Sequence, residues 1–283
     1  MPSKKEDSIN YQNHQNINDK LKENNLENAL YIVPTPIGNL RDITLRALDV
    51  LSRVEIIVCE DSRVSSKLLG FYQISGKEFI VYNDNSQEKD RKKILHSLMS
   101  NKSVALLSDA GTPLISDPGY KLINFLREFN QKIIPLPGAC SITTAICASS
   151  IACDNFLFIG FLPTPKIQKA NLFETLKHQP SFVFFEAPTR ILTTLKILQQ
   201  TLGNRKVCVA KELTKLHEEV ISDDVENLIK IFEEKPGKIK GEFVVIVEKS
   251  ARNTQGFTQD NLLKAIKNEL KNNVSIKDLS QKL

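Results

Sequence analysis

The sequence predicts an α/β protein with two α/β domains, a mostly parallel sheet in the N-terminal domain and a mixed sheet in the C-terminal domain. The chain has 283 residues, more than a single hydrophobic core of ordinary size requires. Through residue 150, short apolar runs alternate with amphipathic stretches, which is typical of parallel strands joined by crossover helices. Beyond residue 155 there are more strand-like runs for each helical stretch, so we expect a mixed sheet there.

The composition is that of a soluble globular protein, with 41% hydrophobic and 25% charged residues. The formal net charge of +5 permits an anionic partner without requiring one. Five cysteines form no Cys-x-x-Cys pair and four histidines lie far apart, so we expect reduced thiols and no bound metal. No apolar run approaches the ~20 residues of a membrane span, and no signal-peptide segment begins the chain. These features predict a cytoplasmic protein without membrane contact.

The N-terminal domain is predicted over residues 29–150. Residues 1–28 before it are polar and rich in Asn, Lys and Glu, which predicts a disordered tail. Asp42 or Thr44 can cap the first helix, and Gly70 is expected to end the second. The strands of this domain are expected at 30–33, 56–59, 79–82, 104–107 and 132–135, and its helices at 45–54, 65–69, 87–99, 120–129 and 142–149.

The C-terminal domain is predicted over residues 151–250. Phe156 and Phe161 lie in its first apolar run, and we interpret them as core residues rather than as rings that stack on bases. Residues 251–283 predict a short helical extension, which lacks the further helix of a DNA-reading motif, so no DNA partner is expected. The strands of this domain are expected at 156–162, 182–185, 207–210, 218–222 and 242–248, and its helices at 166–177, 191–202 and 225–232.

The loop after the strand at 104–107 is the first candidate for a ligand site. It holds two glycines, two prolines and two aspartates, and it takes about nine residues where such turns usually take two to six. Ligands of open α/β sheets bind at the carboxyl ends of the strands, and Gly111 allows close approach to the backbone. The alternative interpretation is an ordinary turn between a strand and a helix.

Four loops at strand ends should lie together at one edge of the first sheet. They combine backbone donors, small residues and carboxylates with few cations, which suits a ligand with a sugar and a positive centre better than a triphosphate. The sequence contains no dinucleotide fingerprint Gly-x-Gly-x-x-Gly, no P-loop and no Gly-x-Ser-x-Gly elbow. The four loops are residues 34–40, 60–63, 109–119 and 137–141.

Four motifs in order resemble the ribosomal RNA small subunit methyltransferase I family, a branch of the tetrapyrrole methylase superfamily. The resemblance covers residues 30–249 and implies two α/β domains that hold S-adenosylmethionine in the cleft between them. It further implies a homodimer whose substrate is the 2′-hydroxyl of a cytidine in 16S ribosomal RNA, near the decoding centre of the small ribosomal subunit. The motifs are Leu30-Tyr-Ile-Val-Pro-Thr-Pro-Ile-Gly-Asn-Leu-Arg-Asp-Ile-Thr-Leu-Arg-Ala-Leu48, Glu60-Asp-Ser-Arg63, Ser108-Asp-Ala-Gly-Thr-Pro-Leu-Ile-Ser-Asp-Pro-Gly119 and Lys211-Glu-Leu-Thr-Lys-Leu-His-Glu-Glu219.

The resemblance also implies which residues hold the cofactor. One departure is visible, since the related enzymes usually read Pro-Gly-Pro-Ser where this chain has Pro137-Gly-Ala-Cys-Ser141. Ala139 and Cys140 are small, so we expect the binding site to persist. The implied cofactor residues are Ile37, Gly38, Ala110, Gly111, Thr112, Ile115, Ser141, Ile142, Glu186 and Leu213.

Asp61 is the predicted general base for such a reaction, with Arg63 beside it to orient the carboxylate or hold a phosphate. A ribose hydroxyl is a poor nucleophile and gains typically 10²–10⁴-fold from a base. The alternative role for Asp61 is a surface ion pair or a helix cap, and Glu60 and Asp109 are substitute bases. The cations expected to hold RNA are Arg41, Arg46, Arg63, Lys67, Lys166, Lys169 and Arg190.

Two other functions stay open at this point. The first is a methylase of the same fold that acts on a small tetrapyrrole or on a protein side chain. The second is a non-enzymatic protein that binds RNA or assists assembly and has kept the fold. Cofactor binding separates the second function from the enzymes.

Overall fold

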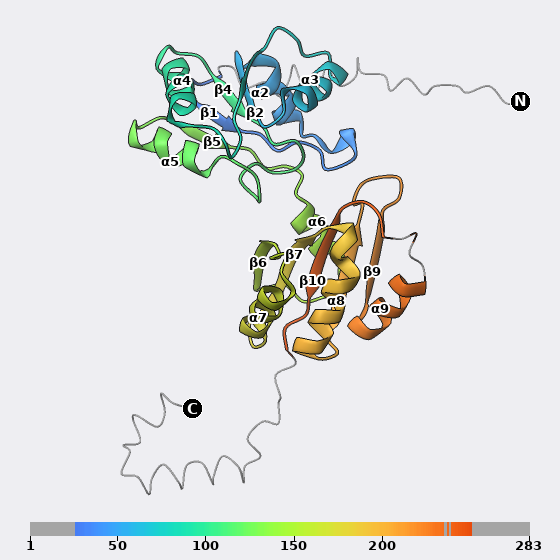
Figure 1. Ribbon diagram of the computed structural model, residues 1–283. Coiled ribbons are helices and arrows are strands. Elements are labelled where there is room, and N and C mark those ends of the chain that lie inside the picture. The colour runs from blue at the N-terminus through green and yellow to red at the C-terminus, as the bar shows by residue number, and fades with distance from the viewer. Residues whose placement is uncertain (1–25, 235–236, 238, 251–283) are drawn as a thin grey trace, which may run out of the picture.

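The computed structural model describes residues 26–250 apart from 235, 236 and 238 (Figure 1). The predicted tail, except for residues 26–28, and the predicted extension at 251–283 therefore lie outside the described residues. Two sheets with their helices follow each other along the chain. No helix of the described part is long and apolar enough to span a bilayer.

The first sheet is parallel throughout, as predicted. Its strand order is β3-β2-β4-β1-β5, and each neighbouring pair runs in the same direction. The carboxyl ends of these strands therefore meet at one edge. The strands are β1 (Leu30–Ile32), β2 (Ile56–Cys59), β3 (Glu78–Val81), β4 (Val104–Leu106) and β5 (Ile133–Pro135).

Helices cover both faces of this sheet because alternate strand residues point to opposite sides. Tyr31 and Ile57 pack beneath α2 and α3, whereas Leu30 and Ile56 pack against α4 and α5 on the other face. Thr44 caps α2 through a bond from Ala47 N to its Oγ1. The helices are α2 (Leu45–Arg53), α3 (Ser62–Phe71), α4 (Glu88–Met99) and α5 (Tyr120–Glu128), with the 3-10 turn η1 (Leu40–Asp42) before α2.

The second sheet is mixed, again as predicted. Its order is β6-β7-β10-β8-β9. β6 and β7 run parallel, and the other three pairs are antiparallel. The last strand thus lies in the middle of the sheet. The strands are β6 (Phe156–Phe161), β7 (Ser181–Glu186), β8 (Lys206–Lys211), β9 (Glu219–Asp224) and β10 (Phe243–Val247).

One face of the second sheet carries three helices, and the other carries α6 (Ser141–Ala148). Phe182 and Phe184 point toward the three-helix side, and Val183 points toward Ile142 and Ala145 of α6. Helix α6 lies before the predicted domain boundary at 150/151, yet its apolar side chains complete the core of the second sheet. The three helices are α7 (Lys166–Leu176), α8 (Pro188–Leu202) and α9 (Val225–Glu234).

Helices α3 and α8 differ most from the sequence predictions. Helix α3 runs through Gly70 instead of ending there, and it begins at Ser62 because the Asp61 side chain accepts a bond from Arg63 N. Helix α8 begins at Pro188 rather than at residue 191, because proline is favoured in the first turn, where no backbone donor is needed.

Candidate functional site

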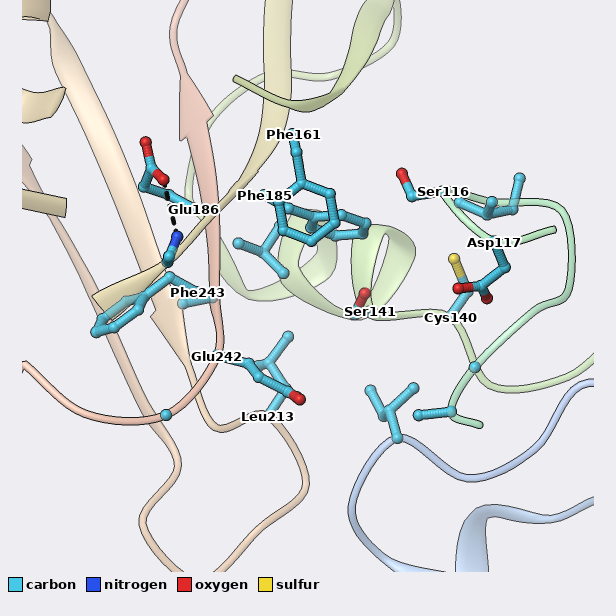
Figure 2. Close-up of a pocket in the computed structure, with 18 of the residues that line it drawn as sticks. Ser116, Asp117, Cys140, Ser141, Phe161, Phe185, Glu186, Leu213, Glu242 and Phe243 are labelled. Atoms are coloured by element: carbon cyan, nitrogen blue, oxygen red, sulfur yellow. Dashed lines mark hydrogen bonds between the residues drawn. The ribbon is translucent and has the colours of Figure 1, made fainter. Parts of the chain in front are cut away.

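A cavity of about 340 Å³ lies between the two domains (Figure 2). This volume falls within the roughly 300–1,000 Å³ range of small-molecule sites. The first domain contributes residues from the loops that follow β1, β4 and β5. The second domain contributes the ends of β6, β7 and β8, the start of β10 and the turns beside them. The candidate site is therefore complete only when both domains are present.

The three first-domain loops are bonded into one platform. Thr35 and Gly111 exchange backbone hydrogen bonds of 2.8 and 2.9 Å, and Thr112 Oγ1 donates to Ala139 O at 2.9 Å. Gly138 packs so closely on Pro34 that an added Cβ would lie 2.6 Å from the proline Cβ. These contacts hold the three loops together on the first-domain side of the cavity.

The long loop between β4 and α5 lines the cavity, as the sequence predicted. Leu114 and Ser116 have φ values of 72° and 65°, and Gly119 has 141°. Non-glycine residues adopt this region at a cost of order 1–3 kcal/mol and usually where function requires it. The resulting bends place Ile115, Ser116 and Asp117 in the cavity wall.

Glu186 forms a buried, charged part of the second-domain wall. Its side chain is fully enclosed, and Oε2 accepts from Lys169 Nζ at 3.1 Å and from Thr194 Oγ1 at 2.6 Å. Oε1 accepts from Ala187 N at 2.8 Å and lies 2.7 Å from Arg190 Nε in an ion pair. The prediction that Lys169 is an RNA-binding surface cation is wrong, because its helix points it into the core toward this carboxylate.

Phe161 stands at the cavity with its ring open to solvent. It is 61% exposed, and its ring centroid lies 5.3 Å from that of Phe185, a second lining residue. Phe156, at the start of the same strand, is 36% exposed. The prediction that both rings are core residues is therefore wrong. A register shift between Phe158 and Gly160 redirects the end of β6, as β-bulges do beside functional sites.

The predicted catalytic pair, Asp61 and Arg63, does not line the cavity. Arg63 donates to Asp61 from its backbone N at 2.8 Å, from Nε at 3.0 Å and from Nη2 at 2.6 Å. These bonds lower the pKa of the Asp61 carboxyl to about 2, which makes it a weak proton acceptor near neutral pH. The observed geometry is the helix cap and ion pair that the sequence left as the alternative. The backbone N–H of Asp61 donates to Oδ1 of the lining residue Asp109 at 3.3 Å.

Eight of the ten predicted cofactor residues line the cavity: Ile37, Ala110, Gly111, Thr112, Ile115, Ser141, Glu186 and Leu213. The other two do not. Ile142 is buried against the second sheet. Gly38 packs on the second domain, where an added Cβ would lie 3.1 Å from Leu213 O. The structure thus brings eight of the ten predicted residues together, and the role of each residue stays a prediction.

Several lining residues were missed, for two reasons. Glu242, Phe243 and Val244 reach the cavity because β10 inserts between β7 and β8, and the sequence does not reveal this strand order. Asp117 belongs to the loop that the sequence singled out, but no feature of the sequence separates it from Asp109.

The cavity is acidic. Its lining holds four carboxylates (Asp109, Asp117, Glu186 and Glu242), and none of its described lining residues is lysine, arginine or histidine. Lys169 and Arg190 offset Glu186, and Lys215 offsets Glu242. Asp109 and Asp117 still leave the wall negative, which suits a cationic ligand and disfavours a polyphosphate. The described residues contain no cluster of His, Cys, Asp and Glu that could hold a metal ion.

A family model and curated relatives match this chain over most of its length. Residues 29–229 match the model of the Tetrapyrrole (Corrin/Porphyrin) Methylases. A ribosomal RNA small subunit methyltransferase I of Rickettsia prowazekii is 42% identical over 255 residues, which cover 90% of this chain and 89% of the relative.

Solved structures share the fold at lower identity. The cobalamin biosynthetic enzyme cobalt precorrin-4 methyltransferase superposes with a TM-score of 0.58 at 19% identity, over 78% of this chain and 95% of the other. Uroporphyrin-III C-methyltransferase of Thermus thermophilus, solved in complex with S-adenyl homocysteine, gives 0.52 at 16% identity, over 77% and 96%.

Proposed function

We propose that this protein methylates 16S ribosomal RNA. The chain belongs to the tetrapyrrole (corrin/porphyrin) methylase family, and within it to the ribosomal RNA small subunit methyltransferase I proteins. The acceptor in this proposal is the 2′-hydroxyl of a cytidine near the decoding centre. The observation that carries the proposal is the acidic cavity between the domains, together with the name shared by relatives that align over most of the chain.

The cofactor is S-adenosylmethionine, which supplies an electrophilic methyl group on a sulfonium when bound. The cavity fits it in size and in charge, because four carboxylates and no cation line it. Gly111 and its neighbours would present backbone groups to the cofactor, and Leu213 would contact it from the second domain. The chain's own contribution is to hold the acceptor in line and to exclude water, an alignment that can supply ~7–11 kcal/mol of the barrier.

RNA would approach the open side of the cavity. The exposed Phe161 ring offers a surface for a base, since aromatic rings stack on bases of single-stranded RNA. Arg63, whose side chain is 86% exposed and paired with Asp61, would contact a phosphate of the RNA. A ribose inside a helix cannot reach a cavity between two domains, so the target nucleotide would be splayed out of its stack.

The proposal includes a homodimer that works in the cytoplasm on the small ribosomal subunit. Its positive net charge of +5 favours an anionic substrate of this kind and predicts salt-sensitive binding. The remaining predicted cations on the two domains, among them Arg41 and Lys67, would add to this attraction.

A transfer assay tests the substrate class. Purified protein is mixed with S-adenosylmethionine labelled in its methyl group and, in parallel, with small ribosomal subunits from cells lacking the modification, naked 16S RNA, uroporphyrinogen and a protein extract. We expect label in the subunits only. Label in uroporphyrinogen or in protein would replace the RNA substrate with that acceptor. Cofactor binding without any transfer would favour an assembly protein that has kept the fold.

A further inference from the structure

We infer that Asp117 is the carboxylate that accepts the proton from the acceptor hydroxyl during methyl transfer. This inference rests on the proposed function, since it names the base of that reaction. It replaces Asp61, whose carboxylate lies outside the cavity lining and is bonded to Arg63.

The fold places Asp117 in the wall that faces the second domain. Figure 2 shows Ser116 and Asp117 on one side of the cavity and Phe161 and Phe185 on the other. The two sides approach each other at Gly160, where an added Cβ would lie 3.4 Å from Ser116 Oγ. A nucleotide whose base stacks on Phe161 would therefore bring its ribose to the part of the wall that Asp117 occupies.

The other carboxylates of the cavity are engaged. Glu186 is paired with Lys169 and Arg190, Glu242 lies 3.0 Å from Lys215 Nζ, and Asp109 accepts a backbone bond from Asp61. No ion pair to Asp117 is formed by any residue in the described part of the chain. Its neighbour is the Ser108 hydroxyl, which also donates to Gly111 O at 3.1 Å. Within the described residues, Asp117 and Asp109 are therefore the two lining carboxylates without an ion pair, and Asp109 carries the bond from Asp61 N.

The surroundings of Asp117 also suit a base. Its pKa is raised to about 6, chiefly by burial and also by the charges of Glu60, Asp109 and Asp84, while the Ser108 hydroxyl opposes the shift. These acidic groups follow β2, β4 and β3, so the negative charge comes from three neighbouring strand ends. A base acts best with a pKa near the working pH, and Asp117 meets this condition whereas Asp61, at about 2, does not.

The step balances in atoms and charge. The ribose oxygen forms a bond to the transferred methyl carbon while the bond from that carbon to sulfur breaks, and the bonding pair remains on sulfur. The hydroxyl proton passes to the Asp117 carboxylate and from there to solvent. The ether product and the neutral thioether then leave the cavity.

The test compares Asp117→Asn with wild type in single-turnover methyl transfer to small ribosomal subunits between pH 5 and 9. We expect the wild-type rate to rise through a midpoint near pH 6 and then to level off. The variant should be slower by roughly 10²–10⁴-fold and should lack this rise. Calorimetric titration with S-adenosylhomocysteine should give a Kd within about threefold of wild type, which also shows that the variant is folded.

Asp84→Asn is the matched control. Asp84 is exposed and acts on Asp117 only through its charge, so its removal should leave the plateau rate unchanged and move the midpoint to lower pH. A fully active Asp117→Asn enzyme, or a loss of activity in Asp61→Asn alone, would overturn the inference. So would an Asp117→Asn variant that binds S-adenosylhomocysteine more than tenfold weaker but transfers at the wild-type rate when saturated, since Asp117 would then be a cofactor ligand. A wild-type protein that transfers no methyl group to RNA would instead refute the proposed function itself.

Discussion

Substitution of Lys169 by methionine should lower the free energy of unfolding strongly, because this side chain lies in the core and not on the surface. The Lys169 side chain is 2% exposed, and its Nζ donates to Glu186 Oε2 at 3.1 Å and to Thr194 Oγ1 at 2.6 Å. Methionine has a similar volume but cannot donate, so Glu186 would keep a buried charge with fewer partners.

The size of the effect follows from what remains around the carboxylate. Removal of one partner from a buried ion pair costs roughly 3–5 kcal/mol. Arg190 and Ala187 N still contact Glu186 Oε1, which keeps the expected loss near the lower end, at about 3 kcal/mol. For a chain of this size, that loss corresponds to a fall in Tm of roughly 6–12 °C.

Thermal and urea unfolding, followed by circular dichroism, measure the change. Lys166→Met is the matched control, because Lys166 begins the same helix and is exposed, and it should unfold within about 0.5 kcal/mol of wild type. In the double variant Lys169→Met/Glu186→Gln the carboxylate charge is gone, so part of the stability should return. A Lys169→Met protein as stable as the control would refute the assignment of this lysine to the core.

Three further predictions concern the platform, the aromatic rim and the acidic wall. Gly138→Ala should weaken S-adenosylhomocysteine binding about tenfold or more, because the added Cβ would collide with Pro34; calorimetry measures this. Gly70→Ala has open space at its Cβ inside α3 and should raise the free energy of unfolding by about 0.5–1 kcal/mol, as measured by urea unfolding. Phe161→Ala should lower kcat/KM for the small subunit roughly tenfold through lost stacking and leave the S-adenosylhomocysteine Kd within threefold, while Phe156→Ala, outside the cavity lining, should change neither. Asp117→Asn should be more stable than wild type at pH 8 and equally stable near pH 4. The raised pKa of Asp117 means that its ionisation destabilises the folded state as pH rises from about 4 through 6. Melting curves across this range measure the difference.

The strands and helices follow closely from the spacing of apolar residues. All five strands of the first sheet appear where short apolar runs end in loops, since alternate residues of each run are needed on both faces. The misplaced boundaries lie where a local interaction outweighs propensity. The Asp61 cap starts α3 early, and the helix passes Gly70 to end at Phe71.

The site was only partly predictable, because burial and strand order are tertiary properties. The amphipathic pattern around Lys169 did not show that this lysine faces Glu186, and the run at 156–162 did not show that a bulge turns Phe161 outward. The loop from β4 was found because its length and composition were unusual. The choice of Asp117 over Asp61 required the contacts of each carboxylate, which depend on residues far apart in the chain.

The measurement that tests the central claim most directly is the chemical position of the transferred methyl group. Small ribosomal subunits labelled by the purified protein would be digested with alkali, which cleaves RNA only where the 2′-hydroxyl is free, and the resistant dinucleotide would be identified by mass spectrometry. The account predicts one resistant dinucleotide that carries its methyl group on the ribose of a cytidine near the decoding centre. Label on a base, or label lost entirely to mononucleotides, would contradict it.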